Sequence, residues 1–293
     1  MILVDSINLR AYGKINLGLD VVGVREDGYH LVSMVMQSVR LFDKLTITKS
    51  DEEGIRLTTN LDFLPVNDNN LVVKAARLLM EEFDVKKGVD IYLEKHIPVA
   101  AGMAGGSSDC AAALYGINRL FNLKLSTKEL MDRGVTLGAD VPYCIMRGTA
   151  LSEGIGEKLT RLAPMPDCYI VIAKPPVSVS TKYVYEHIDN EGIDEHPDIA
   201  GIIKGLEDGD LHAITDRLGN VLEKVTVNMH PEIDKIKQMM IDEGALNSLM
   251  SGSGPTVFGI FDDKAKADKA NKAIFTSGIA KRVYTVVPVN VNN

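Results

Sequence analysis

The sequence has few of the features that mark disulfide frameworks, zinc sites or membrane-spanning proteins. Its 293 residues include only three cysteines, Cys110, Cys144 and Cys168, and they form no C-x-x-C pair. An odd number of widely spaced cysteines disfavours a disulfide framework and a zinc site, so we interpret all three as buried structural residues. No apolar run approaches the roughly 18 residues that a membrane-spanning helix requires.

An excess of basic residues is also missing. The 32 basic and 40 acidic residues give a formal net charge of -8, which argues against a nucleic-acid-binding surface. An anionic small molecule is still compatible with this charge, since a pocket can use backbone N–H groups. The stretch MILVDSINLRAYGK lacks the basic-then-apolar pattern of a signal peptide, so we expect a cytoplasmic protein without a membrane partner.

The pattern of apolar residues predicts a mixture of strands and helices in about two domains. Strands are predicted at 15–24, 34–39, 44–49, 89–94, 143–152, 169–173, 256–261 and 282–289. A helix is predicted at 70–83, and a second one ends at about residue 121. A third runs from a capping box at 126–129 to Gly134 or Gly138, several lie within 179–243, and the last is at 264–276. Because the two types do not alternate regularly, we predict the α+β class. The turn-rich segment 162–168 predicts a boundary between domains 1–162 and 163–293.

One segment is unusually dense in small residues: Pro98–Leu114, PVAAGMAGGSSDCAAAL. Glycines let a backbone approach a ligand closely, and a helix start supplies unpaired amides and the positive end of a dipole. The segment therefore predicts an anion site, with a Ser-capped helix after a flexible loop as the alternative. It matches neither the Walker loop nor G-x-G-x-x-G, and the chain has no H-R-D or D-F-G of protein kinases.

A second glycine-rich turn, SGSGPT at 251–256, lies between two predicted strands. Alone, this turn would be interpreted as an ordinary connection between strands. Two Gly/Ser loops in one chain favour a polyphosphate or another anionic ligand held by both.

Two residues suit phosphoryl transfer to an alcohol. Lys14 begins an apolar segment, and Asp140 lies in the apolar stretch LGADVPYC, where a carboxylate needs a partner or a function. In such a pair the carboxylate takes the hydroxyl proton and the ammonium stabilises the developing charge. An exposed surface lysine is the alternative. Tyr29 and His30 either stack on a flat ring or form an exposed turn.

Three ordered motifs resemble the GHMP kinases, the family of galactokinase, homoserine kinase and mevalonate kinase. They are AYGKINLGLDVVGVREDGYH, PVAAGMAGGSSDCAAAL and LMSGSGPTVFGIF, and LGADVPYC and PVSVSTKYVY also fall in the family's order. The resemblance covers nearly the whole chain. It implies a two-domain α+β fold, with an N-terminal domain like domain 2 of ribosomal protein S5 and a ferredoxin-like C-terminal domain.

The combination of KIN and DGYH resembles the branch of the family whose acceptor carries a cytidine. It implies transfer from ATP to the 2-hydroxyl of 4-diphosphocytidyl-2-C-methyl-D-erythritol, in non-mevalonate isoprenoid and terpenoid biosynthesis. Asp140 matches the family's base and Lys14 its partner. Mg²⁺ is implied beside the phosphates, with Ser108 or Asp109 near the ion, directly or through water.

The remaining implied contacts fall on matching positions of the chain. ATP is expected on Asn70, Leu71, Pro98, Val99, Ala100, Ala101, Gly102, Met103, Ala104, Gly105, Gly106, Ser107, Ser108 and Asp109. The acceptor is expected on Asn16, Tyr29, His30, Thr181, Tyr185, Gly252, Ser253 and Gly254.

The chain departs from the family pattern in a few places. Tyr12-Gly13 stands where the family commonly has Pro-Ala. Ala104 stands where it commonly has Gly, and Asp109 where it commonly has Asn. The Ala104 methyl takes room near the phosphates and Asp109 adds negative charge, so both bear on nucleotide affinity. A homoserine or mevalonate type of kinase and a catalytically silent nucleotide-binding relative are the alternatives. We expect a monomer or homodimer without a nucleic-acid partner.

Overall fold

The computed structural model describes residues 5–193 and 195–291, and the chain forms two compact units. Unit 1 takes the chain up to Gly13, Leu41–Val99 and Ala104–Met146. Unit 2 takes Lys14–Arg40, Ala100–Met103 and the chain from Arg147 onward. Because this division is discontinuous, it does not reduce to one cut in the chain, and the boundary predicted at residue 162 stays a prediction.

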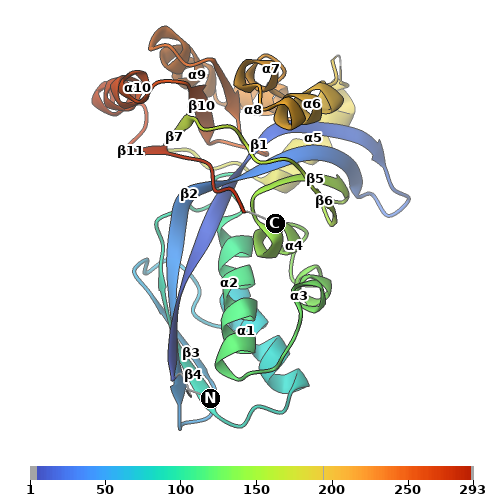
Figure 1. The fold of residues 1–293 in the computed structure, drawn as a ribbon, viewed down its shortest axis with the longest axis vertical. Helices are drawn as coiled ribbons and strands as arrows, with labels where there is room; N and C mark the ends of the chain where they lie inside the picture. Colours follow the sequence, from blue (N-terminus) through green and yellow to red (C-terminus); the bar gives the residue numbers. More distant parts are fainter. Residues whose placement is uncertain (1–4, 194, 292–293) are drawn as a thin grey trace. The chain divides into compact units, whose positions relative to one another are not determined.

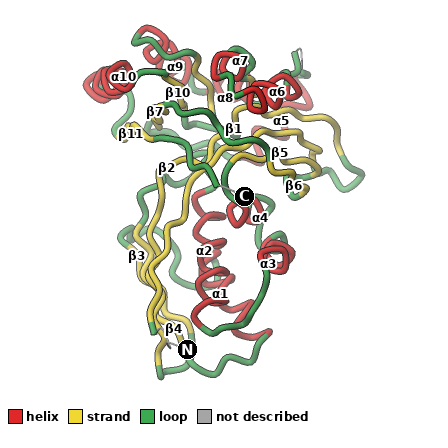
Figure 2. Tube along the Cα trace, viewed as in Figure 1, coloured by secondary structure: helices red, strands yellow, loops and turns green. Residues whose placement is uncertain are grey.

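Unit 1 packs helices against one face of a sheet (Figures 1 and 2). Its strands come from β1 (Ser6–Val24), β2 (His30–Ser50), β3 (Ile55–Thr59) and β4 (Gly88–Glu94), and β4 pairs antiparallel with β2 and parallel with β3. Helices α1 (Leu71–Glu82) and α2 (Gly105–Leu120) lie side by side on these strands. Helix α2 comes close to the sheet at Gly116, which has no side chain. A methyl group there would lie only 2.6 Å from Ile47 Cδ1.

Two helices of unit 1 begin where the sequence predicts, because side chains cap them. Asn70 caps α1, and its Oδ1 accepts the Val72 N–H at 2.9 Å. Ser126 and Glu129 form the predicted capping box of α3 (Thr127–Gly134). Both predicted starts are confirmed, and α3 ends at Gly134 as expected.

The predicted strand at residues 143–152 is wrong in its first half. The segment starts inside α4 (Val141–Met146), and β5 (Thr149–Gly154) begins only after Gly148, which turns the chain with φ of 81°. Pro142 fits the first turn of a helix, where a missing N–H costs no hydrogen bond. A short apolar run does not by itself distinguish a buried helix from a strand.

Unit 2 contains a four-stranded antiparallel sheet. The strands of this sheet are β7 (Tyr169–Lys174), β9 (Asn247–Met250), β10 (Val257–Phe261) and β11 (Arg282–Val286). The helices α9 (Glu232–Asp242) and α10 (Lys264–Ser277) belong to the same unit. The strand order is β11-β7-β10-β9, and α9 and α10 pack on the sheet around Phe261, Ile236 and Ile274. This succession of strands and helices is that of a ferredoxin-like domain, as the resemblance implies.

The other elements of unit 2 carry several candidate site residues. Strand β5 pairs with β2, β6 (Lys158–Arg161) pairs with β5, and β8 (Gly219–Asn220) pairs in parallel with β1. Before α9 the chain forms α5 (Thr181–Glu191), α6 (Ile199–Asp208), α7 (Leu211–Thr215) and α8 (Glu223–Met229). The helical character predicted for residues 179–243 is confirmed.

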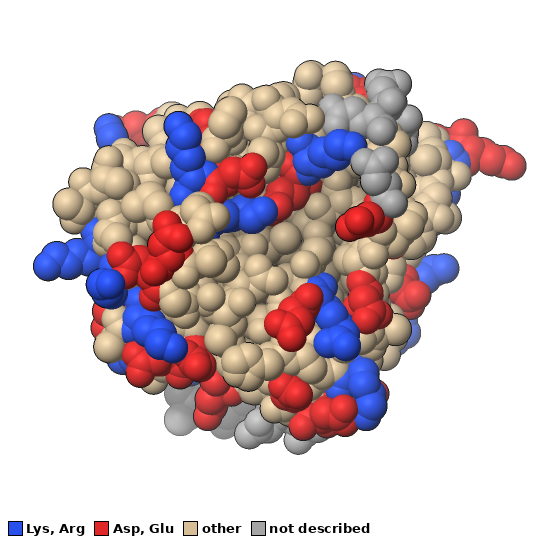
Figure 3. Space-filling model, turned by 90° about the horizontal axis from the view of Figure 1, so that it is seen from above, with Lys and Arg blue, Asp and Glu red and all other residues tan. Residues whose placement is uncertain are grey.

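The structure also bears on the expectations about cysteines, membrane-spanning helices and surface charge. All three cysteines are free and buried, as predicted. Burial raises the pKa of the Cys110 and Cys168 thiols to about 12. Within the described part of the chain, no helix combines the length and the apolar character needed to cross a membrane. Figure 3 shows acidic and basic side chains interspersed on the face that it draws.

Candidate active site

The glycine-rich segment, residues 98–109, adopts left-handed backbone at two alanines. Ala100 and Ala104 have φ of 49° and 52°, in the region that favours glycine. Ala104 is the N-cap of α2 and makes no side-chain capping bond, so the alternative of a Ser-capped helix is wrong. The first turn of α2 therefore has amides that its cap residue does not bind, which is the arrangement that suits an anion.

Unit 1 brings other predicted positions to the start of α2. A methyl group on Gly106 would lie 3.8 Å from Leu71 Cδ1, and one on Gly138 would lie 3.8 Å from Ser107 Oγ. Leu71 therefore borders the first turn of α2, and so does the turn that leads to Asp140. Asp140 is half-buried and directly precedes α4.

Two polar side chains of the segment point into the protein. Ser108 is 2% exposed, and its hydroxyl donates to the carbonyl oxygen of Tyr12. Asp109 is 3% exposed, and its Oδ2 accepts a hydrogen bond from Lys95 Nζ at 2.6 Å. Neither side chain is presented as a ligand for an external metal ion. Across residues 5–193 and 195–291, no three His, Cys, Asp or Glu side chains gather into a metal-binding group.

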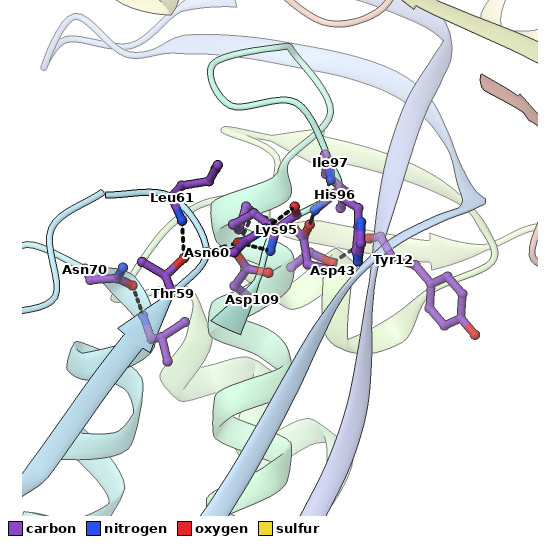
Figure 4. Close-up of polar contacts among 12 residues, drawn as sticks. Tyr12, Asp43, Thr59, Asn60, Leu61, Asn70, Lys95, His96, Ile97 and Asp109 are labelled. Atoms are coloured by element: carbon purple, nitrogen blue, oxygen red, sulfur yellow. Dashed lines mark hydrogen bonds and ion pairs between the residues drawn. The ribbon is translucent and has the colours of Figure 1, made fainter. Parts of the chain in front are cut away.

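A buried charge cluster, Asp43–Lys95–Asp109, lies beside the segment in unit 1 (Figure 4). Lys95 Nζ donates to Oδ2 of both carboxylates, and Asp43 Oδ1 also accepts the Ile97 N–H at 2.8 Å. Burial by itself lowers the pKa of Lys95, but the two carboxylates outweigh it and raise that pKa. Burial raises the pKa of Asp109 well above its usual range, against the opposing effect of Lys95.

Unit 2 assembles a second group of candidate residues around Lys14. This lysine is buried, and its Nζ donates to Asn16 Oδ1 at 2.6 Å and to the Gly102 carbonyl oxygen at 2.9 Å. Ser251 Oγ donates to the same carbonyl oxygen at 3.0 Å. One atom of the first glycine-rich segment thus contacts both the predicted catalytic lysine and the second glycine-rich turn.

Glycine makes this close approach sterically possible. A Cβ on Gly102 would lie 2.1 Å from the Ser251 carbonyl oxygen, and one on Gly252 would lie 3.1 Å from the Gly102 carbonyl oxygen. Side chains at these positions would force the two segments apart. Packing alone therefore explains both glycines, independently of any ligand.

A series of contacts leads from the second turn to the predicted cytosine-binding residues. Ser253 Oγ and Thr181 Oγ1 share a hydrogen bond of 2.8 Å. Thr181 begins α5, and the ring of Tyr185, one turn later, lies 5.0 Å from the His30 ring at an interplanar angle of 44°. Tyr29 is 61% exposed, and its ring takes no part in this series.

Some residues that hold these segments were missed by sequence reasoning. Asn220 Nδ2 donates to the Gly252 carbonyl oxygen at 2.8 Å, and Thr226 Oγ1 donates to the Ser253 carbonyl oxygen at 3.2 Å. Lys95 was missed as well. A single Asn, Thr or Lys has no pattern around it that distinguishes it from a surface residue, so only the tertiary contacts reveal these roles.

Known proteins similar to this chain match it over nearly its whole length. Residues 70–148 match the GHMP kinases N terminal domain, and residues 202–279 match the GHMP kinases C terminal domain. A 4-diphosphocytidyl-2-C-methyl-D-erythritol kinase of Lachnospira eligens is 57% identical over 281 residues, which cover 96% of this chain and 98% of that protein. A protein of the same name from Lachnoclostridium phytofermentans is 55% identical over 266 residues, 91% of each chain.

Solved structures resemble the whole chain too. A crystal structure of 4-(cytidine 5'-diphospho)-2C-methyl-D-erythritol kinase has a TM-score of 0.84 at 30% identity, covering 97% of this chain and 100% of the other. A homoserine kinase from Cytophaga hutchinsonii has a TM-score of 0.77 at 23% identity, covering 99% and 96%. At that lower identity the likeness shows the fold alone.

Proposed function

This chain belongs to the GHMP kinases, which use ATP as co-substrate, and on that premise we propose that it phosphorylates 4-diphosphocytidyl-2-C-methyl-D-erythritol on its 2-hydroxyl. The acceptor is the one in the names of relatives that are 55–57% identical. The observation that carries the proposal is the Gly102 carbonyl oxygen, which accepts hydrogen bonds from both Lys14 and Ser251. It joins a lysine suited to phosphoryl transfer to both glycine-rich segments.

The proposed reaction is a direct in-line transfer. The 2-hydroxyl oxygen forms a bond to the γ-phosphorus, the bond from that phosphorus to the β–γ bridging oxygen breaks, and ADP leaves. The hydroxyl proton passes to the Asp140 carboxylate. Backbone amides of Gly102–Ser107 and the dipole of α2 hold the β- and γ-phosphates. The Ser108 amide, also expected there, donates to the Ala104 carbonyl oxygen at 2.9 Å instead.

Lys14 supplies positive charge in this proposal. Its ammonium donates to neutral oxygen atoms of Asn16 and Gly102, and these hydrogen bonds orient it. We propose that this charge stabilises the Asp140 carboxylate and the charge that develops during transfer. On the acceptor side, Tyr29 and the His30–Tyr185 pair are proposed to hold the cytosine.

Mg²⁺ would accompany ATP in an enzyme of this chemistry and would supply positive charge to the phosphates. Ser108 and Asp109 do not fit as its direct ligands here, because the Ser108 hydroxyl donates to Tyr12 and the Asp109 carboxylate pairs with Lys95. The proposal also includes a cytoplasmic monomer or homodimer in non-mevalonate isoprenoid biosynthesis, without a nucleic-acid partner.

The proposal is tested by measuring ADP release from ATP with three acceptors: the cytidyl compound, homoserine and mevalonate. We expect kcat/KM for the cytidyl compound to exceed the other two by at least about 10²-fold, because a ring-binding pair gives no binding energy to an aliphatic acceptor. Preference for homoserine or mevalonate would contradict the proposal that the cytidyl compound is the acceptor. ADP release with none of the three would indicate a silent nucleotide-binding relative.

A further inference from the structure

The Asp43–Lys95–Asp109 cluster joins the chain before the glycine-rich segment to the end of that segment. Asp43 lies on β2, Lys95 directly follows β4 and precedes the segment, and Asp109 is the last residue of the segment, in the first turns of α2. All three side chains are buried, with at most 7% exposure. Two carboxylates, one from β2 and one from α2, therefore meet around one ammonium (Figure 4).

The chain that enters the segment is held at several backbone atoms. Asp43 Oδ1 accepts the N–H groups of His96 and Ile97, the latter at 2.8 Å. Asn60 Oδ1 accepts the Lys95 N–H at 2.8 Å, and Asn60 Nδ2 donates back to the Lys95 carbonyl oxygen at 3.2 Å. Residues 95–97 are thus fixed to β2 and to the end of β3 before the segment begins.

The helix that leaves the segment is held by the Lys95 side chain. Lys95 Nζ donates to Asp109 Oδ2 at 2.6 Å, and a methyl group on Gly105 would lie only 3.3 Å from this Nζ. The ammonium therefore lies against the first residue of α2. A positive charge is unfavourable at a helix N-terminus, so the flanking carboxylates are needed to keep it there.

We propose that Lys95 is a positioning residue for the kinase reaction: its ammonium ties the chain entering the glycine-rich segment to the helix leaving it, and so fixes the amides that receive the nucleotide phosphates. This inference rests on the proposed function. Ala100 and Ala104 adopt left-handed backbone, which costs free energy for any residue with a Cβ. Holding both ends of the segment opposes its relaxation out of that conformation.

Two substitutions of Asp109 separate the hydrogen bond from the charge. Asp109→Asn and Asp109→Ala both remove the negative charge, but only asparagine keeps an oxygen that accepts from Lys95. Asp43 still pairs with Lys95 in both variants, so both are expected to fold. We expect the KM for ATP to be about tenfold higher in Asp109→Ala than in Asp109→Asn, with similar KM values for the cytidyl acceptor.

Hydrogen exchange gives a second measurement that needs no nucleotide. Amides of residues 98–109 should exchange about tenfold faster in Asp109→Ala than in Asp109→Asn, because only the alanine variant releases α2 from Lys95. Asp132→Ala is the matched control. Asp132 pairs with Lys128 on the surface of α3, and its loss should change neither the KM for ATP nor the exchange.

Equal KM values for ATP in Asp109→Ala and Asp109→Asn would overturn the inference, whatever the exchange rates. Gly106→Ala then shows whether the proposed nucleotide site falls with it. Its methyl group has room in the fold, with Leu71 Cδ1 at 3.8 Å as the nearest atom, but would obstruct a phosphate on the first turn of α2. A higher KM for ATP in Gly106→Ala would keep the site and reject only the role of Lys95, whereas an unchanged KM would reject both.

Discussion

Lys14 and Lys95 are almost equally buried, at 6% and 7% exposure, yet they donate hydrogen bonds to different kinds of oxygen atom. Lys95 Nζ pairs with two buried carboxylates, whereas Lys14 Nζ donates to a side-chain amide oxygen and a backbone carbonyl oxygen. A buried ion pair fixes its members, because removing one leaves a buried charge. Hydrogen bonds to neutral oxygen atoms orient an ammonium. Burial of a lysine is therefore no sign of catalysis unless the charges of its partners are known.

The largest effect is expected at the carboxylate that we propose acts with Lys14. Asp140→Asn should lower turnover by about 10²–10⁴, because an amide cannot take the hydroxyl proton. Binding of the cytidyl acceptor should survive, and so should stability, since Asp140 is only half-buried. ADP release measures the turnover, and equilibrium binding of the acceptor measures its affinity. Near-full activity would remove Asp140 from the proposed mechanism.

On the Lys95 side, Asp109 should make stability rather than turnover depend on pH. Burial raises the pKa of Asp109 in the folded protein, so the folded state binds one more proton than the unfolded state between about pH 3.9 and the folded pKa. Stability should fall with rising pH across this window, by up to about 1.4 kcal/mol per pH unit. Lys95 stays charged there, because its pKa is also raised.

Asp109→Asn removes the titrating group and should remove this slope. Urea unfolding of the two proteins at a series of pH values gives the difference in unfolding free energy, which should grow with pH in favour of the asparagine variant and then level off. A constant difference would show that Asp109 ionises as an ordinary carboxyl group and that the Lys95 cluster does not hold its proton.

The smallest effect is expected at Ala104, in the segment that both lysines border. Ala104→Gly relieves a left-handed alanine with φ of 52° and should stabilise the protein by up to about 1 kcal/mol, less the added backbone entropy of the unfolded chain. The KM for ATP should be equal or lower, since a methyl group is removed. Calorimetry and ADP release check the two parts. A clearly higher KM would mean that the phosphates lie elsewhere.

The sequence predicts those parts of the fold that depend on local chemistry. Asn70 and Ser126 cap helices because their side chains accept nearby amides, and such signals are readable without tertiary structure. The strand predicted across Tyr143 was wrong, because its apolar neighbours fit a buried helix equally well. Both glycine-rich segments were also identified from the sequence.

The charge cluster could not be predicted, because its members are far apart in the chain. Asp43, Lys95 and Asp109 meet only through the packing of β2, β4 and α2. Asp109 was expected to add negative charge near the nucleotide, whereas the structure pairs it with Lys95. The contact of Lys14 with Gly102 and Ser251 likewise requires the folded chain, although Lys14 itself was identified from its motif.

The difference between the two lysines is tested most directly by measuring unfolding free energy and turnover for Lys14→Met and Lys95→Met under one condition. Lys95→Met should lose about 3–5 kcal/mol of stability, since it strands two buried carboxylates. Lys14→Met should lose at least about 10² in turnover, because it removes the ammonium that is proposed to stabilise the developing charge. Full stability of Lys95→Met, or full turnover of Lys14→Met, would contradict this difference between the two lysines.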